Sequence, residues 1–249
     1  MQTYKTSEIA KQTGLHPNTI RFYEEIGFLT KPERLPNGYR VFTPLHLEQV
    51  RFIRLALRAE VLQNGLRDHA IAIIRFCSAC RFEEAERETN CYLEQIDREI
   101  AFANGAIHAV EATLFRVPAP DAPLRRRSDA AGALGITQET LRNWERNGLV
   151  SIERMPNGYR VYSPADMERL LMIRTLRLAN YSLSAILRLM NKLTFSRQVA
   201  IAATLDTPDE SEEIISVCDH LLFALSCARE DAQQMPAHIR QMQMFQTLQ

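Results

Sequence analysis

The stretch ERLPNGYRV at residues 33–41 returns almost unchanged as ERMPNGYRV at residues 153–161. Before it, TIRFYE at residues 19–24 is echoed by TLRNWE at residues 140–145. The offset is 121 residues for the earlier pair and 120 for the later pair, so one residue is lost between them. Two similar segments of about 50 residues with one small gap indicate an internal duplication.

The first copy carries start and stop signals for two short helices. Residues 7–13 predict a helix that Gly14 ends. His16-Pro17 opens a second helix, because proline suits the first helical position, and Gly27 closes it. Two short helices joined by a turn that contains glycine predict a helix-turn-helix.

A β-hairpin is expected next, around Asn37-Gly38. Asn-Gly is a strong signal for a two-residue hairpin turn, in which both residues take positive φ. We interpret this hairpin as the wing of a winged helix-turn-helix unit. Thr43-Pro44 then predicts the cap and first turn of a third helix, and Ser163-Pro164 does so in the second copy.

The region between the two copies predicts one long helix. Its apolar residues alternate spacings of three and four, the pattern of a coiled-coil seam, at Leu93, Ile96, Ile100, Ala103, Ile107, Val110 and Leu114. Three prolines between residues 117 and 123 then predict a stiff linker. At the other end of the chain we interpret the Met-rich stretch with Met235, Met242 and Met244 as a frayed helix.

The sequence thus predicts a mainly α protein with tandem winged helix-turn-helix units. Their wings are small β-hairpins, a long coiled-coil helix lies between the units, and a C-terminal helical segment follows. The expected segments are a first winged unit (1–76), the long helix (81–116), a Pro-rich linker (117–125), a second winged unit (126–194) and a C-terminal helical region (195–249).

Both copies resemble the MerR family of bacterial transcription regulators. The family pattern is a helix-turn-helix ending in a Thr-Ile-Arg-Tyr-Tyr-Glu-like stretch, then Gly-Leu, then a wing with Gly-Tyr-Arg. In this chain Gly-Tyr-Arg stands at residues 38–40 and 158–160. The second copy also has YSLSAI at residues 181–186, similar to the family's Gly-Tyr-Ser-Leu-x-x-Ile. The resemblance covers roughly residues 3–116 and 126–194. It implies binding to double-stranded DNA, with RNA polymerase as a partner at a promoter.

The resemblance also raises the question of pairing. Family members normally carry one unit and dimerise through the long helix. Two chains of this protein would form a homodimer in that way, or the two units of one chain would form an intramolecular pseudo-dimer. Because Asn143 and Trp144 replace Phe22 and Tyr23, we expect the two DNA half-sites to be asymmetric.

The candidate DNA contacts come from the second helix and the wing of each unit. That helix fits the major groove, and the wing lies against the backbone or minor groove. We interpret the helix arginines as base or phosphate contacts and the wing Tyr-Arg pairs as phosphate clamps. The candidates are Asn18, Thr19, Arg21, Tyr23, Tyr39 and Arg40 in the first copy, and Gln138, Thr140, Arg142, Trp144, Tyr159 and Arg160 in the second.

Two plainer interpretations of these residues stay open. Tyr23 and Trp144 are alternatively core aromatic residues. Arg21 and Arg142 are alternatively surface ion-pair partners of Glu25 and Glu145 or of neighbouring residues.

Charge is distributed in blocks although the net charge is zero. Residues 1–62 hold nine Lys/Arg and six Asp/Glu (+3), and residues 124–192 hold twelve and six (+6). Residues 81–116 hold four and eight (−4), and residues 206–232 hold one and eight (−7). The two basic blocks coincide with the winged units, where phosphates would be met.

No catalytic, cofactor or metal site is expected. The sequence has no Gly-rich phosphate loop, no Gly-x-Ser-x-Gly and no His-Glu-x-x-His, so an enzyme is not expected. The Cys77-x-x-Cys80 pair is either a metal or redox sensor or, as we favour, a pair of idle thiols. With an odd number of cysteines, no signal peptide and no long apolar run, we expect a cytoplasmic protein without a membrane segment.

The expected function is sequence-specific binding of double-stranded DNA and effector-responsive transcription regulation, with two DNA-reading units per chain. One alternative is an architectural or excision-type DNA-binding protein. Another is a ligand- or drug-sensing module in residues 195–249, whose acidic balance would suit a cationic small-molecule effector.

Overall fold

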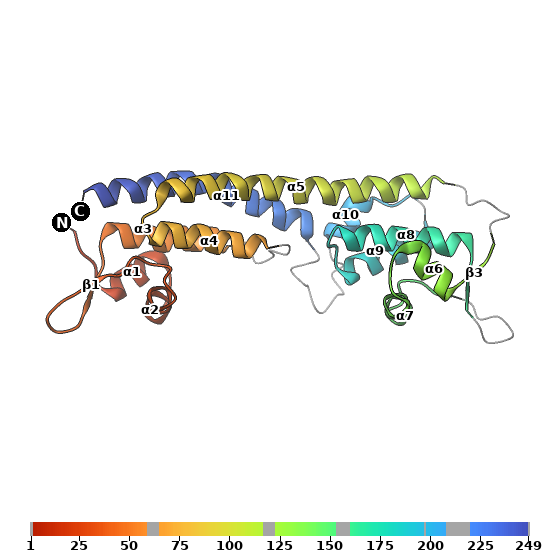
Figure 1. Cartoon of the computed structure of the whole chain (residues 1–249), viewed down its shortest axis with the longest axis horizontal. Helices are drawn as coiled ribbons and strands as arrows, with labels where there is room; N and C mark the ends of the chain where they lie inside the picture. Colours follow the sequence, from red (N-terminus) through yellow and green to blue (C-terminus); the bar gives the residue numbers. More distant parts are fainter. Residues whose placement is uncertain are drawn as a thin grey trace. The chain divides into compact units, whose positions relative to one another are not determined.

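The computed structural model describes residues 2–58, 65–116, 123–152, 160–196, 198–207 and 220–248. The chain divides into two compact units, of which unit 1 comprises residues 1–98 and 224–249 and unit 2 comprises residues 99–223. The described elements are mostly helices with two small antiparallel sheets (Figure 1). The prediction of a mainly α protein with winged helix-turn-helix units and a long helix is confirmed.

Unit 1 begins with the helix-turn-helix. Helix α1 (Thr6–Thr13) ends at Gly14 with φ of +65°, and helix α2 (Pro17–Glu25) starts with proline in its first turn, as expected. The His16 side chain caps α2 by accepting a hydrogen bond of 3.2 Å from the Asn18 amide. Ile9 and Ile20 are fully buried between the two helices and the rest of the unit.

The first wing is a two-stranded hairpin. Strands β1 (Glu33–Arg34) and β2 (Arg40–Val41) pair antiparallel, and Leu35 N donates to Tyr39 O at 2.9 Å. Gly38 N donates back to Leu35 O at 2.8 Å, so three residues form the loop. Only Gly38 takes positive φ, at +81°, and Asn37 does not. The predicted hairpin is therefore confirmed, but the predicted two-residue turn is wrong. The left-handed conformation that this turn requires at residue 38 explains why glycine stands there.

Helices α3 (Pro44–Ala56), α4 (Leu66–Ser78) and the first part of α5 (Phe82–Leu114) complete the amino-terminal part of unit 1. Thr43 and His46 form a capping box at the start of α3. Of the predicted seam of α5, Ile96, Ala103, Ile107 and Val110 are buried, whereas Leu93, Ile100 and Leu114 are half-buried.

Helix α11 (Leu221–Thr247) is continuous through the Met-rich stretch, so the predicted fraying is wrong. The reason is a buried seam with alternating spacings of three and four residues, at Leu225, Ala228, Ala232, Met235, Ile239 and Met242. Two contacts within unit 1 show that α11 lies beside α3. His238 is paired with Glu48, and Arg58 Nε, just after α3, donates to Asp231 Oδ2 at 2.8 Å. It also reaches α5 through the 2.7 Å ion pair between Arg229 and Asp97.

Unit 2 repeats this plan. It contains β3 (Arg125–Arg126), α6 (Arg127–Leu134), α7 (Gln138–Arg146), β4 (Val161–Tyr162), α8 (Pro164–Leu178), α9 (Leu183–Phe195) and α10 (Ile201–Asp206). Gly135 ends α6 with φ of +61°, as Gly14 ends α1. The turn of the second predicted wing, residues 153–159, lies outside the described residues.

Strand β4 pairs with β3, so Arg125 is a strand residue rather than the end of a linker. The pairing of Arg125 with Tyr162 matches the single bridge between Tyr4 and Phe42 in unit 1. Of the expected linker, residues 117–122 lie outside the described part of the chain. Among the described helices, none has an apolar stretch long enough to cross a membrane.

Candidate nucleic-acid interface

The second helix of unit 1 exposes its arginine. Arg21 is exposed, and its Nη1 donates to the neutral Asn18 side chain at 3.1 Å. Asn18 is exposed as well, and Thr19 is half-buried. Because Asn18 carries no charge, Arg21 keeps its full positive charge for an outside partner. The structure thus places the predicted arginine, amide and hydroxyl groups along the amino-terminal part of α2.

Tyr23 lies at the inner edge of the same helix. Its side chain is half-buried, and burial raises the pKa of its hydroxyl, while the charge of Arg54 opposes that shift. The phenol therefore stays neutral at physiological pH and can donate a hydrogen bond. Because Tyr23 is only half-buried, it is not purely a core aromatic residue.

The second helix of unit 2 carries its arginine differently. Arg142 is exposed, but its Nη1 pairs with Glu139 Oε2 at 3.1 Å. Arg146 pairs with the same carboxylate. The ion-pair partner of Arg142 is therefore Glu139, not Glu145. Gln138 is exposed and Thr140 is half-buried, with its hydroxyl 2.8 Å from that of Thr137.

Trp144 does not lie on the outer face of α7. Its side chain is only 4% exposed and packs in the core of unit 2 together with Leu141, one turn earlier on the same face of the helix. Burial removes the indole from a DNA-facing surface, so the candidate role of Trp144 as a contact is corrected to that of a core aromatic residue.

The wing arginine of unit 1 is held by a glutamate of α2. Glu24, whose side chain is 11% exposed, pairs with Arg40 and also accepts from Arg34 at 3.3 Å. The wing is thereby tied to the second helix of its own unit. Tyr39, next to Arg40, is 71% exposed and free to meet a ligand.

Unit 2 repeats this tie in a denser form. Glu145, whose side chain is 6% exposed, pairs with Arg160 at 2.6 Å and with Arg127 at 2.9 Å. The Tyr162 hydroxyl also donates to Glu145, and burial, followed by this hydrogen bond, raises the pKa of Tyr162 to about 12. Tyr159, the remaining wing candidate, lies outside the described residues.

The two glutamates were missed as site residues by sequence reasoning. A signal for them existed, because Glu24 and Glu145 occupy the same position in the two copies, as do Arg40 and Arg160. A charge pair kept in both copies of a duplication is a reason to expect contact between its members. We assign the glutamates a positioning role, since they fix the wing arginines rather than face solvent.

The Cys77–Cys80 pair lies apart from this surface. Cys77 is 1% exposed, and burial raises the pKa of its thiol far above the usual range, so it stays protonated. Cys80 is half-buried near the Thr30 hydroxyl, at 3.7 Å. Within the described part of the chain, no group of three or more His, Cys, Asp or Glu residues is placed to hold a metal ion.

Comparison with known proteins matches both copies to one family. Residues 5–42 match the family model described as MerR family regulatory protein, and residues 126–193 match that described as MerR HTH family regulatory protein. These are the segments that contain α1, α2 and the first wing, and α6 to α9.

Curated relatives are similar over short segments of the chain. The chain is 50% identical over 50 residues to the HTH-type transcriptional regulator CueR of Salmonella typhi, covering 20% of this chain and 36% of CueR. It is 40% identical over 68 residues to the HTH-type transcriptional regulator YfmP of Bacillus subtilis, covering 27% of this chain and 47% of YfmP. The match thus spans less than half the length of either relative.

A solved structure also shows similarity, namely HiNmlR, a MerR family regulator lacking the sensor domain, bound to promoter DNA. The sequence identity is 19% and the TM-score is 0.25, with 55% of this chain and 95% of that chain covered. The likeness to the MerR family depends on the two sequence matches. Two segments of the chain, residues 5–42 and 126–193, match MerR-family models, and together they make up less than half of its length.

Proposed function

We propose that this protein binds double-stranded DNA at specific sequences and regulates transcription, with two DNA-reading units in one chain. The observation that carries the proposal is the duplicated surface of α2 and α7. Each helix exposes an arginine, Arg21 or Arg142, and each is tied to its wing by a glutamate. We call α2 and α7 the recognition helices. The arginines are suited to guanine edges or phosphates in a major groove.

Regulation at a promoter, with RNA polymerase as a partner, belongs to the same proposal. It is supported by the names of CueR and YfmP, which are transcriptional regulators. An architectural or excision-type role would use the same DNA-binding surface without an effect on transcription. A promoter-fusion assay separates the two, because only a regulator changes reporter output when it occupies its site.

We further propose that a single chain, rather than a homodimer, supplies both units to one DNA site. Each compact unit is completed by a segment from outside its own winged region, residues 224–249 in unit 1 and residues 99–116 in unit 2. Because both units are formed from residues of one chain, one chain can supply both. Mass measurement by light scattering, alone and with DNA, is expected to give one 28.6 kDa chain per duplex site.

The test of DNA binding starts with selection of sites from a random duplex pool by the full chain. Affinity for the selected duplex is then measured at several salt concentrations. We expect affinity to fall steeply with salt, because phosphate contacts release counterions. Failure to select any sequence, or affinity that does not respond to salt, would contradict the proposal.

A further inference from the structure

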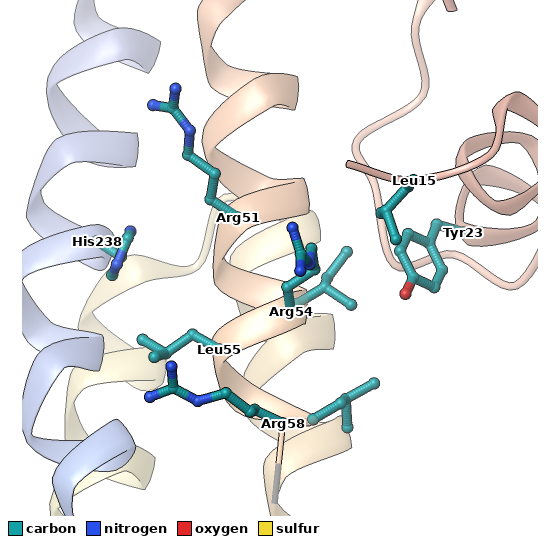
Figure 2. A pocket seen from close by; sticks show the side chains of 9 residues that line it. Leu15, Tyr23, Arg51, Arg54, Leu55, Arg58 and His238 are labelled. Carbon is teal, nitrogen blue, oxygen red and sulfur yellow. The ribbon is translucent and has the colours of Figure 1, made fainter. Parts of the chain in front are cut away.

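An open cavity of about 500 Å³ lies in unit 1 between α2, α3 and α11 (Figure 2). Its basic side chains are Arg51 and Arg54 from α3, Arg58 just after α3, and His238 from α11, and Tyr23 from α2 faces it from the other side. Four aliphatic side chains complete the lining. A volume of this size lies within the usual range for small-molecule sites.

The open side of the cavity is positively charged. None of its nine lining residues, all within the described part of the chain, is acidic. The carboxylates that pair with Arg51 and Arg58 belong to Glu48 and Asp231, whose side chains are only 1% and 4% exposed. These carboxylates lie behind the arginines and do not present negative charge to a ligand.

The same carboxylates hold two of the guanidinium groups in place. Arg51 Nη1 lies 3.3 Å from Glu48 Oε2, and Arg58 Nε donates to Asp231 Oδ2 at 2.8 Å. Each arginine has further N–H groups in a planar fork, which matches the geometry of a carboxylate or phosphate. Guanidinium groups that are already positioned lose less freedom when they bind an anion.

The duplication shows which of these arginines the fold itself requires. Arg54 and its counterpart Arg174 each lie against the glycine that ends the first helix of the unit, so both copies keep this arginine. The counterparts of Arg51 and Arg58, at the same offset of 120 residues, are Leu171 and Leu178. A winged unit therefore forms without these two arginines, although in unit 1 Arg58 also joins α11 through Asp231.

We propose that this cavity binds a small anionic molecule that carries a phosphate or carboxylate group beside an apolar part. The anion would lie against Arg51 and Arg58, and the apolar part against Leu15 and Leu55. Because Tyr23 belongs to a recognition helix and His238 to the carboxy-terminal helix, the bound molecule would contact both. This inference reverses the charge expected for an effector from the acidic composition of residues 206–232.

Anion binding is tested on the full chain without DNA, so that it does not depend on the proposed function. The probes are phenyl phosphate and inorganic pyrophosphate, titrated by calorimetry at constant ionic strength, with phenol as the neutral comparison. We expect saturable binding of phenyl phosphate and none of phenol. Binding should weaken at least about tenfold in Arg51→Gln, since a charge-assisted hydrogen bond is lost.

The matched control is Arg81→Gln, which removes another exposed, paired arginine of unit 1 outside the cavity and should leave binding unchanged. A second variant, Leu55→Glu, places a carboxylate in the cavity and should abolish binding, with folding checked by circular dichroism. Absence of saturable binding by the wild type would overturn the proposal. So would binding of phenyl phosphate by Arg51→Gln and by Leu55→Glu that is as tight as in the wild type. A phosphate effect seen only with duplex DNA present would assign the arginines to the DNA backbone instead, which also overturns it.

Discussion

Arg160 Nη1 lies 2.6 Å from Glu145 Oε2, and Arg40 is paired with Glu24 in the same way, so each wing arginine is tied to the recognition helix of its own unit. The pairs join residues 15 and 16 positions apart in sequence. Under the proposed function they would orient the wing before DNA binds, which would lower the entropy lost when both elements contact one duplex. A role of Arg40 and Arg160 as phosphate clamps remains a prediction, and the pairs must then be kept or exchanged on binding.

The first prediction concerns the stability of unit 2. Glu145→Gln leaves Arg127 and Arg160 without their carboxylate, so the free energy of unfolding should fall by about 2 kcal/mol. A loss below the roughly 3–5 kcal/mol of a fully buried pair is expected, because both guanidinium groups keep partial contact with water. Urea unfolding followed by the fluorescence of Trp144, the single tryptophan, measures it.

Glu139→Gln is the matched control for that experiment, because its carboxylate also pairs with two arginines but is exposed. Exposed pairs contribute little, so the change should stay within about 0.5 kcal/mol. An equal fall in the free energy of unfolding for both substitutions would show that the buried pairs of Glu145 stabilise unit 2 no more than the exposed pairs of Glu139.

The second prediction concerns unequal DNA contacts. Arg21 is bonded to a neutral amide, whereas Arg142 must leave the carboxylate of Glu139 to reach DNA. Arg21→Ala should therefore weaken binding by about tenfold or more, and Arg142→Ala by clearly less. Fluorescence anisotropy with the selected duplex measures both, and equal losses would contradict the asymmetry.

The third prediction is a rise in affinity. Glu139→Gln removes a negative charge from α7 and releases Arg142 and Arg146 for phosphates. Affinity for duplex DNA should rise several-fold, and the salt slope should steepen by about one unit for each additional phosphate that an arginine neutralises. An unchanged slope would place α7 away from the DNA backbone.

The fourth prediction is a loss of stability in acid. The Thr43 amide donates to His46 Nδ1 at 3.0 Å, and His46 Nε2 lies 3.1 Å from the Thr30 carbonyl, so the ring is neutral with its proton on Nε2. Burial lowers the pKa of His46 to about 4, whereas its unfolded value is near 6.5. The unfolded chain therefore binds more protons in this window, and stability falls as pH drops from about 6.5 to 4.

The free energy of unfolding should fall by about 3 kcal/mol across that window because of His46. Urea unfolding of the full chain at several pH values measures this loss. His46→Gln keeps an acceptor for Thr43 and a donor for Thr30 but does not titrate. The variant should lose this part of the pH dependence, and an identical profile in both proteins would rule His46 out as its source.

The fifth prediction concerns thiol reactivity. Cys77 is buried and protonated, whereas Cys91 is exposed. A maleimide reagent at neutral pH should label Cys91 quickly and Cys77 only when unit 1 unfolds. Mass mapping of labelled peptides measures this, and rapid labelling of native Cys77 would revive a sensing role for the Cys77–Cys80 pair.

The helix-turn-helix of unit 1 was predictable because its signals are local. Gly14 takes the left-handed conformation that ends α1, and Pro17 stands in the first turn of α2. Thr43 caps α3 as its sequence indicates. Each of these residues acts on backbone groups within four positions, so the amino-acid order alone carries the information.

The contacts of the candidate interface were less predictable because they are not local. Whether Arg40 faces solvent or Glu24 depends on where the hairpin folds over α2. The burial of Trp144 did have a signal, since it stands three residues after the buried Leu141 on one face of α7. In α11, Pro236 lies inside the helix and suggests a break, but the seam from Leu225 to Met242 outweighs it.

The most direct test is the affinity of the full chain for its selected duplex, measured across a series of salt concentrations beside the double variant Arg21→Ala, Arg142→Ala. Two arginine-bearing recognition helices on one chain predict a steep salt dependence for the wild type and a shallower one, with much weaker binding, for the variant. Wild-type and variant curves that coincide, or no measurable affinity at low salt, would contradict the account.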